Sequence, residues 1–238
     1  RYEVPKGCGR NSMFAGSLWI GGVDETGQLR VAAQTYRQSG IDYWPGPLSG
    51  GLSGGNASTD QEHCDAWNKM FKINKTEIDA FRADFADGVI DNPQDYPNVF
   101  DWPAVGNPNV VEELYIEGDQ AIWWIINDRG NTHTETGGQP IGVEIHMLAF
   151  AFTTANAVND MTFYRQTVIN RSTQTLNETF IGQWADADLG RFDDDYVGCD
   201  TLRGLGFCYN GDDDDDAANG YGRRPPAIGI DFFQGPIA

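Results

Sequence analysis

The sequence predicts a mainly β fold, a β-sandwich or jelly-roll-like domain with one short helix and a long acidic loop of the calcium-binding type. Three observations support this prediction. Runs of β-branched and aromatic residues recur along the chain, turn-forming residues separate these runs, and one segment has the periodicity of an amphipathic helix. A chain of 238 residues is long enough to bury its own core. We therefore expect a single β domain over residues 1–238, which could be a fragment of a longer protein.

Two strands joined by a tight turn are expected near the N-terminus. Met13–Val23 and Leu29–Arg37 have the residue types of strands, and the polar segment Asp24–Gln28 lies between them. Gly27 can supply the positive φ that a tight turn requires. This pattern predicts a β-hairpin.

One helix is expected in the middle of the chain. Thr76–Asp79 resembles a capping box with an aspartate in its fourth place, and Ile78, Phe81 and Phe85 share one helical face. Gly88 can end the helix. We expect this helix to be short and to lie against a sheet.

Later strands follow from long apolar or β-branched runs, and proline-rich segments between strands should be irregular. The Pro-rich or Gly-rich segments are 44–58 and 91–109. The predicted later strands are 121–127, 142–152, 161–170, 178–186 and 227–233. About eight strands in all favour two packed β layers.

An acidic segment, residues 183–216, carries the clearest functional signal. Asp186 and Asp188 are two residues apart and precede Gly190, which is the front half of a calcium loop. Five consecutive aspartates, residues 212–216, are instead typical of a solvated loop. The predicted Ca²⁺ ligands are Asp186, Asp188, Asp193, Asp194, Asp195 and Asp200.

The charge of the chain limits its partners. Lys and Arg together number 16 and Asp and Glu 35, so the formal net charge is -19. Nucleic acid and anionic membrane surfaces would be repelled by this charge. No apolar run is long enough for direct membrane insertion. Bound Ca²⁺ would relieve part of the repulsion among the carboxylates.

The four cysteines, Cys8, Cys64, Cys199 and Cys208, contain no CxxC spacing and so do not resemble a zinc ribbon. Disulfides are the favoured interpretation, with Cys199–Cys208 closing a local loop and Cys8–Cys64 as the remaining pair, although three connectivities are possible. Disulfides would indicate an oxidising, extracellular location. The alternative is four buried free thiols in a cytosolic protein.

Histidine and carboxylate residues come close in sequence at two places, His133 with Glu135 and Glu144 with His146. Glu144 and His146 would point to the same face of a strand. A transition-metal or acid–base site could be built from these residues. We favour ordinary structural roles, because no HExxH or three-histidine pattern supports such a site.

A glycosidase would need two carboxylates across a cleft and aromatic platforms for the sugar. Tryptophans of a β-sandwich more often fill the core, so sugar stacking is the weaker interpretation. The residues that could be nominated are Asp119, Glu135, Asp186 and Asp188 with Trp123, Trp124 and Trp184.

Long segments of the chain resemble the N-terminal module of large secreted Bacteroidota surface proteins, exported by the type IX secretion system. The resemblance covers most of the chain and rests on SMFAGSLWIGGVDETGQLRVAAQTYRQSGIDYWPGPL, GDQAIWWIINDRGNTHTETGGQPIGVEIHMLAFAF, MTFYRQTVINRSTQTLNETFIGQWADADLG and DDDYVGCDTLRGLGFCYNGD. It implies an extracellular or cell-surface location. It also implies a multidomain protein that continues past residues 229–238. The aspartate-rich insertion of that family is absent from residues 107–117, and 200–202 resembles the Bacteroidota O-glycosylation signal.

Together these observations predict an extracellular, calcium-stabilised structural, adhesive or filament-forming surface module, and an enzyme is less favoured. Its partners would be further copies of itself, other surface proteins or glycans. The alternative is a carbohydrate-binding or carbohydrate-degrading domain. A third hypothesis is a metal-dependent hydrolase centred on His133, Glu135 and His146.

Overall fold

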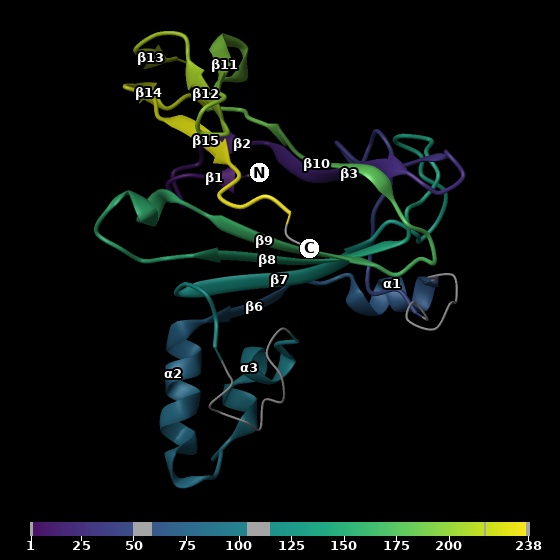
Figure 1. Ribbon diagram of the computed structural model, residues 1–238. Helices are drawn as coiled ribbons and strands as arrows, with labels where there is room; N and C mark the ends of the chain where they lie inside the picture. The colour runs from purple at the N-terminus through teal and green to yellow at the C-terminus, as the bar shows by residue number, and fades with distance from the viewer. Residues whose placement is uncertain (1, 50–58, 104–114, 217, 237–238) are drawn as a thin grey trace. The chain divides into compact units, whose positions relative to one another are not determined.

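The computed structural model describes residues 2–49, 59–103, 115–216 and 218–236, and in this part of the chain the fold is mainly β (Figure 1). The chain divides into two compact units that are interleaved along the sequence. The terminal unit comprises Arg1–Ile20, Ala33–Ser39 and Phe180–Ala238, and the central unit comprises Gly21–Ala32 and Gly40–Thr179. Compact units of this kind occur within single domains as well as between domains, so the prediction of one domain stays a prediction.

The central unit contains a five-stranded antiparallel sheet of order β5-β7-β8-β9, in which β6 also pairs with β7. β7 and β8 pair over the whole of β7, from Gln120 opposite Ala151 to Asn127 opposite Glu144. The strands are β5 (Trp44–Pro45), β6 (Phe71–Asn74), β7 (Gln120–Asn127), β8 (Val143–Ala151) and β9 (Phe163–Asn170). The three strands predicted in this part of the chain are confirmed.

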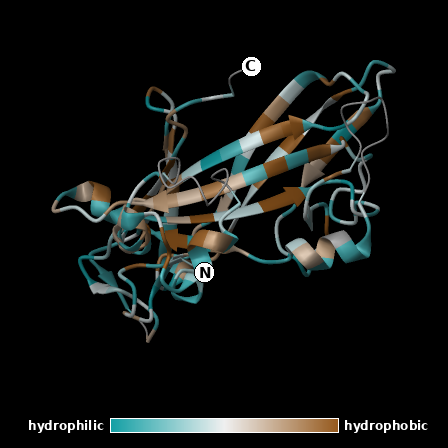
Figure 2. Cartoon of the chain, turned by 90° about the horizontal axis from the view of Figure 1, so that it is seen from below, coloured by the Kyte–Doolittle hydropathy of each residue, from teal (hydrophilic) through white to brown (hydrophobic). Residues whose placement is uncertain are grey.

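Figure 2 shows how hydropathy varies along the strands of this sheet, and successive side chains of a strand point to opposite faces. In β7 the buried residues Ala121, Trp123 and Ile125 alternate with less buried ones. The strand is therefore fully buried on one face, and the other face is only partly covered.

Helix α2 (Lys75–Asp84) confirms the predicted helix, but its N-cap, Asn74, lies two residues before Thr76. Asn74 is the N-cap, because its side chain accepts from Glu77 N while the Glu77 side chain accepts from Asn74 N. Ile78 and Phe81 are buried as predicted, and Gly88 has the left-handed φ of 87° that ends the following turn.

The other helical segments are short. The α-helices are α1 (Gln61–Trp67) and α3 (Pro97–Asp101), and the 3₁₀ helices are η1 (Phe85–Asp87), η2 (Pro93–Asp95), η4 (Ala157–Asp160) and η5 (Phe192–Asp194). Two of them, η2 and α3, lie in the segment 91–109 that was predicted to be irregular, so that prediction is wrong over 93–101. Residues 50–58 and 104–109 of the predicted irregular segments lie outside the described residues. None of the described helices has the length and apolar character needed to cross a membrane.

The hydrophobic core of the central unit lies between the sheet and the helices α2 and α3, which Figure 1 shows beside β6. The helix therefore lies against the sheet, as predicted. The core residues are Phe71, Ile73, Ile78, Phe81, Val99, Trp102, Ile116, Ala121, Trp123, Ile125 and Leu148.

The terminal unit contains a three-stranded antiparallel sheet of order β11-β12-β15 and two short ladders, β1-β2 and β13-β14. The bounds are β1 (Tyr2–Glu3), β2 (Asn11–Met13), β11 (Asp195–Asp200), β12 (Leu205–Asn210), β13 (Asp214–Asp215), β14 (Gly222–Arg223) and β15 (Ala227–Asp231). The acidic segment was predicted as one long loop, and this is wrong because β11, β12 and β13 lie within it.

The predicted hairpin is formed by β3 (Ala15–Val23) and β4 (Leu29–Ala33), which are neighbours in a sheet of order β10-β3-β4 with β10 (Asn177–Asp186). Asp24 organises the turn, since its Oδ1 accepts from the backbone N of Thr26 and Gln28. The hydrogen bond from the Thr26 side chain and those from the turn backbone and Arg30 lower the pKa of Asp24, against the effect of burial. Gly27 has the expected positive φ of 82°.

All four cysteines are free in the structure, so the predicted disulfides Cys199–Cys208 and Cys8–Cys64 are not formed. In the β11–β12 ladder Cys199 is opposite Gly206, and Cys208 is opposite Val197. The two cysteines are therefore diagonal neighbours, for which the Cα separation is about 7–8 Å. A disulfide would need the strands to shift, because it rarely bridges Cα atoms more than about 7 Å apart.

Candidate functional site

The acidic segment of the terminal unit places three carboxylates within electrostatic range of Asp195. Burial raises the pKa of Asp195, and the negative charges of Asp194, Asp215 and Asp188 raise it further, while one hydrogen bond from Leu189 N opposes them. Asp195 begins β11, immediately after the 3₁₀ turn η5 that contains Asp194. This group, Asp188, Asp194, Asp195 and Asp215, is called the acidic cluster below.

Two oxygens of the acidic cluster have no donor. Asp194 Oδ1 and Asp195 Oδ1 are buried, and neither accepts a hydrogen bond of ordinary geometry from a described residue. The Cys208 thiol lies near Asp195, and burial together with this carboxylate raises the pKa of Cys208 to about 11. The other carboxylate oxygen of Asp195 accepts from Leu189 N at 2.9 Å. A buried carboxylate oxygen without a donor or a cation is costly, so these two atoms need an explanation.

Asp215 was not predicted as a ligand, yet it is the most buried carboxylate of the acidic cluster, with 0% of its surface exposed. Its oxygens accept from Arg191 N at 3.2 Å and from Tyr221 N at 2.6 Å. A Cβ atom at Gly190 would lie only 2.1 Å from Asp215 Oδ2, so this approach requires glycine. The run 212–216 gives no sign of which aspartate is buried, and the nearby Gly190 was the only sequence signal for a close approach.

The other three predicted ligands have partners of their own. Asp186 accepts a hydrogen bond from the hydroxyl of Tyr36, and this bond, with burial, raises the pKa of Tyr36 to about 12. Asp193 pairs with Arg191. Asp200 pairs with Arg203 and accepts from the backbone N of Leu202. Of the six predicted ligands, Asp188, Asp194 and Asp195 belong to the acidic cluster. The other three are held by partners outside it.

The acidic cluster does not form a complete metal site by itself. Within the described ranges, no three His, Cys, Asp or Glu side chains are arranged so that they could hold a metal ion as they stand. The donors nevertheless suit a hard cation in kind, because they are carboxylate oxygens and two of them are buried without a donor. The calcium loop and the six aspartates named from the sequence as its ligands therefore stay a prediction.

His133, which belonged to the hypothetical hydrolase site, has a structural position. Its Nδ1 lies 2.8 Å from Val31 O and its Nε2 lies 2.5 Å from Asp128 O. The ring therefore bridges two backbone carbonyl groups. Asp42 and Asp128 have carboxylate oxygens 3.8 Å from this ring, one beside each nitrogen. His133 is therefore a buried structural residue that lies between two carboxylates.

Glu144 and His146 do share one face of β8, as predicted, and they contact each other. His146 Nε2 and Arg171 Nη2 each lie 2.8 Å from Glu144 Oε1, while Leu48 N donates to Oε2. Burial by itself would raise the pKa of Glu144, but these hydrogen bonds lower it to about 2. His133, Glu135 and His146 do not form a metal-holding group among the described residues, so the hydrolase hypothesis loses its geometric basis.

The tryptophans nominated for sugar stacking mostly pack against other aromatic rings. Trp123 lies in the core with only 7% of its surface exposed. Trp184 stacks on Trp19 with an interplanar angle of 4° and meets the Tyr36 ring edge-on. Neither ring is a free sugar platform.

Comparison of the chain with protein-family models, with curated proteins and with solved structures finds no match.

Proposed function

We propose that this chain is a calcium-stabilised structural or adhesive module of an extracellular surface protein. The observation that carries the proposal is the pair of buried carboxylate oxygens without a donor, Asp194 Oδ1 and Asp195 Oδ1, close to the fully buried Asp215. A divalent cation bound there would replace the missing donors and offset the like-charge repulsion within the acidic cluster.

The remaining parts of the proposal rest on sequence. The net charge of -19 favours a protein that binds cations and neutral partners. The resemblance to secreted Bacteroidota surface modules suggests a cell-surface location and association with further copies or other surface proteins. The strand pattern favours sheets packed as a β-sandwich or jelly roll. Extracellular modules bind Ca²⁺ with dissociation constants of about 10⁻⁴–10⁻³ M, which matches a site with few preformed contacts.

The test is the thermal unfolding midpoint of the purified chain in EDTA, in millimolar Ca²⁺ and in millimolar Mg²⁺. At about 10 times the dissociation constant, Ca²⁺ would stabilise the folded state by about 1.4 kcal/mol. For a chain of this size we expect a rise of roughly 3–6 °C in Ca²⁺. Mg²⁺ should have a smaller effect, because it requires stricter octahedral geometry.

Two matched variants locate the site. Asp195→Asn keeps the side-chain shape and an oxygen for Leu189 N but removes the charge, so the Ca²⁺ response should disappear. In EDTA this variant should be at least as stable as the parent chain, because one of the crowded charges is gone. Asp200→Asn, outside the acidic cluster, should keep the full response. No Ca²⁺ response in the parent chain, or an equal response in Asp195→Asn, would overturn the proposal.

A further inference from the structure

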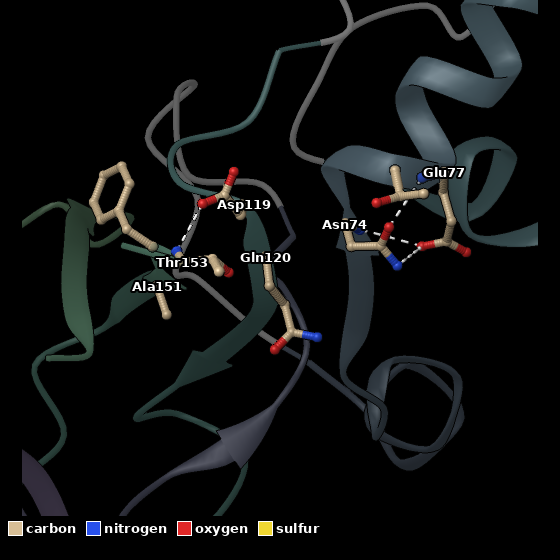
Figure 3. Close-up of a pocket in the computed structure, with 8 residues that line it drawn as sticks. Asn74, Glu77, Asp119, Gln120, Ala151 and Thr153 are labelled. Atoms are coloured by element: carbon tan, nitrogen blue, oxygen red, sulfur yellow. Dashed lines mark hydrogen bonds between the residues drawn. The ribbon is translucent and has the colours of Figure 1, made fainter. Parts of the chain in front are cut away.

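A pocket of about 560 Å³ opens in the central unit, where the N-terminal end of α2, the start of β7 and the end of β8 meet (Figure 3). Its volume falls in the range of small-molecule sites. The residues that matter below are Asn74, Glu77, Asp119, Gln120, Phe152 and Thr153. The pocket shares no residue with the acidic cluster.

One side of the pocket offers hydrogen-bonding groups that are not used within the protein. Asp119 Oδ2 accepts from Thr153 N at 2.7 Å, and this bond holds the carboxylate in place, as Figure 3 shows. No described residue donates to Asp119 Oδ1, and the Gln120 amide and the Thr153 hydroxyl have no protein partner in the described part of the chain. A fixed acceptor thus lies in the same pocket as an amide and a hydroxyl that can both donate and accept.

The opposite side is held rigid by the cap of α2. Glu77 N donates to Asn74 Oδ1 at 2.9 Å, and Asn74 Nδ2 donates to Glu77 Oε2 at 2.7 Å. Asn98 Nδ2 donates to the other oxygen, Glu77 Oε1, at 2.5 Å. Because these bonds are formed before any ligand arrives, this wall would lose little conformational entropy on binding.

The third element is a fixed aromatic ring. Phe152 meets the rings of Phe150 and Phe163 edge-on, at centroid distances of 5.9 and 5.6 Å and interplanar angles of 82°. It still has 36% of its surface exposed. The pocket therefore presents one rigid apolar surface next to its polar groups, the combination typical of small-molecule sites.

The charges of the pocket define the class of ligand. Asp119 and Glu77 line it, and within the described residues no lysine or arginine does, so phosphates and acidic sugars would be repelled. An apolar ligand would leave the polar groups without partners. A neutral saccharide has hydroxyl groups that donate to Asp119 and accept from Gln120 and Thr153, and C–H faces that can cover the Phe152 ring. We infer that this pocket binds a neutral saccharide, which goes beyond the proposed calcium-stabilised role.

The probes are neutral oligosaccharides of the cello-, xylo-, manno- and malto- series, titrated calorimetrically into the full chain in the presence of Ca²⁺. Polygalacturonate oligosaccharides serve as the acidic comparison. We expect binding of at least one neutral series and no binding of the acidic one. Asp119→Ala and Gln120→Ala should each weaken binding about tenfold or more, since each removes a hydrogen bond to the ligand. Phe152→Ala should have a similar effect.

The control is Tyr196→Ala, which disrupts the exposed stack of Tyr196 on Tyr209 in the terminal unit, the rival aromatic surface for sugars. It should leave affinity unchanged, and all variants are compared after their unfolding midpoints are measured. The inference is overturned if no neutral oligosaccharide binds, if Asp119→Ala and Gln120→Ala bind as the parent does, or if Tyr196→Ala alone abolishes binding. A result in Asp195→Asn bears only on calcium, so the two proposals fail separately.

Discussion

Two groups of buried acids in this chain are stabilised in different ways. In the central unit Asp42 and Asp128 are fully buried, and His133 lies between them with one ring nitrogen 3.8 Å from each carboxylate. In the terminal unit Asp194 and Asp195 have buried oxygens without donors. The arginine nearest in sequence, Arg191, pairs through its side chain with Asp193 and Asp216 and gives only its backbone N to Asp215.

The two groups differ in how far the protein itself supplies hydrogen-bond donors for its buried carboxylates. In the central group burial raises the pKa of Asp128, but three backbone N–H groups donate to its carboxylate, so its hydrogen bonds are made within the protein. In the acidic cluster burial raises the pKa of Asp195, and the negative charges of three other carboxylates raise it further. In the proposed function a cation from the medium balances these charges.

The largest expected effect comes from breaking the central group. Asp128 accepts from the backbone N of Ile141, Gly142 and Val143, at 2.5 to 2.8 Å. Asp128→Ala would leave these buried donors without an acceptor and would remove the carboxylate beside His133 Nε2, and we expect a loss of about 3–5 kcal/mol in the free energy of unfolding. Urea denaturation measures it, with the exposed Asp91→Ala as control. A loss below about 1 kcal/mol would contradict the view that this group stabilises the central unit.

The next prediction concerns the stability of the folded protein at low pH. The pKa of Glu144 in the folded protein is lowered from 4.5 to about 2 by His146, Arg171 and Leu48, although burial acts in the opposite direction. A lowered folded-state pKa adds stability above the unfolded-state value, and this stability is lost as the pH falls from about 4.5 to about 2. The loss should be roughly 3 kcal/mol. Unfolding curves from pH 6 to 2 should show this acid limb in the parent chain and a weaker one in Glu144→Gln, while exposed Glu25→Gln should resemble the parent.

The smallest effect is expected at a carboxylate that the sequence nominated but the structure assigns to the surface. Asp193 and Arg191 form an exposed ion pair, and Arg191, with an opposing effect of burial, lowers the pKa of Asp193. Exposed pairs contribute little, so Asp193→Asn should change the free energy of unfolding by less than about 1 kcal/mol. The Ca²⁺ response should also be unchanged. If Asp193→Asn abolished the Ca²⁺ response, the acidic cluster would be wrongly defined and Asp193 would belong to it.

Local pattern was sufficient for most regular elements of the fold. Strand β7 and the hairpin β3–β4 were predicted close to their observed positions, because residue alternation and turn residues act over a few neighbours. The start of α2 was missed, since both Asn74 and Thr76 can cap a helix and only the formed bond to Glu77 distinguishes them. Helix α3 was missed because a proline-rich segment need not be irregular when proline occupies the first turn.

The amino-acid sequence is sufficient to predict a strand-rich fold, a strong negative charge and an acidic segment able to attract cations. Tertiary structure alone decided which carboxylates meet. It placed Asp215 from a run of five aspartates beside Gly190, directed Asp193 to Arg191, and set Asp119 beside Thr153 in a pocket. The physical reason is that alternation and propensity act between near neighbours in the chain, whereas burial, pairing and repulsion of charge depend on distances that only the folded chain sets.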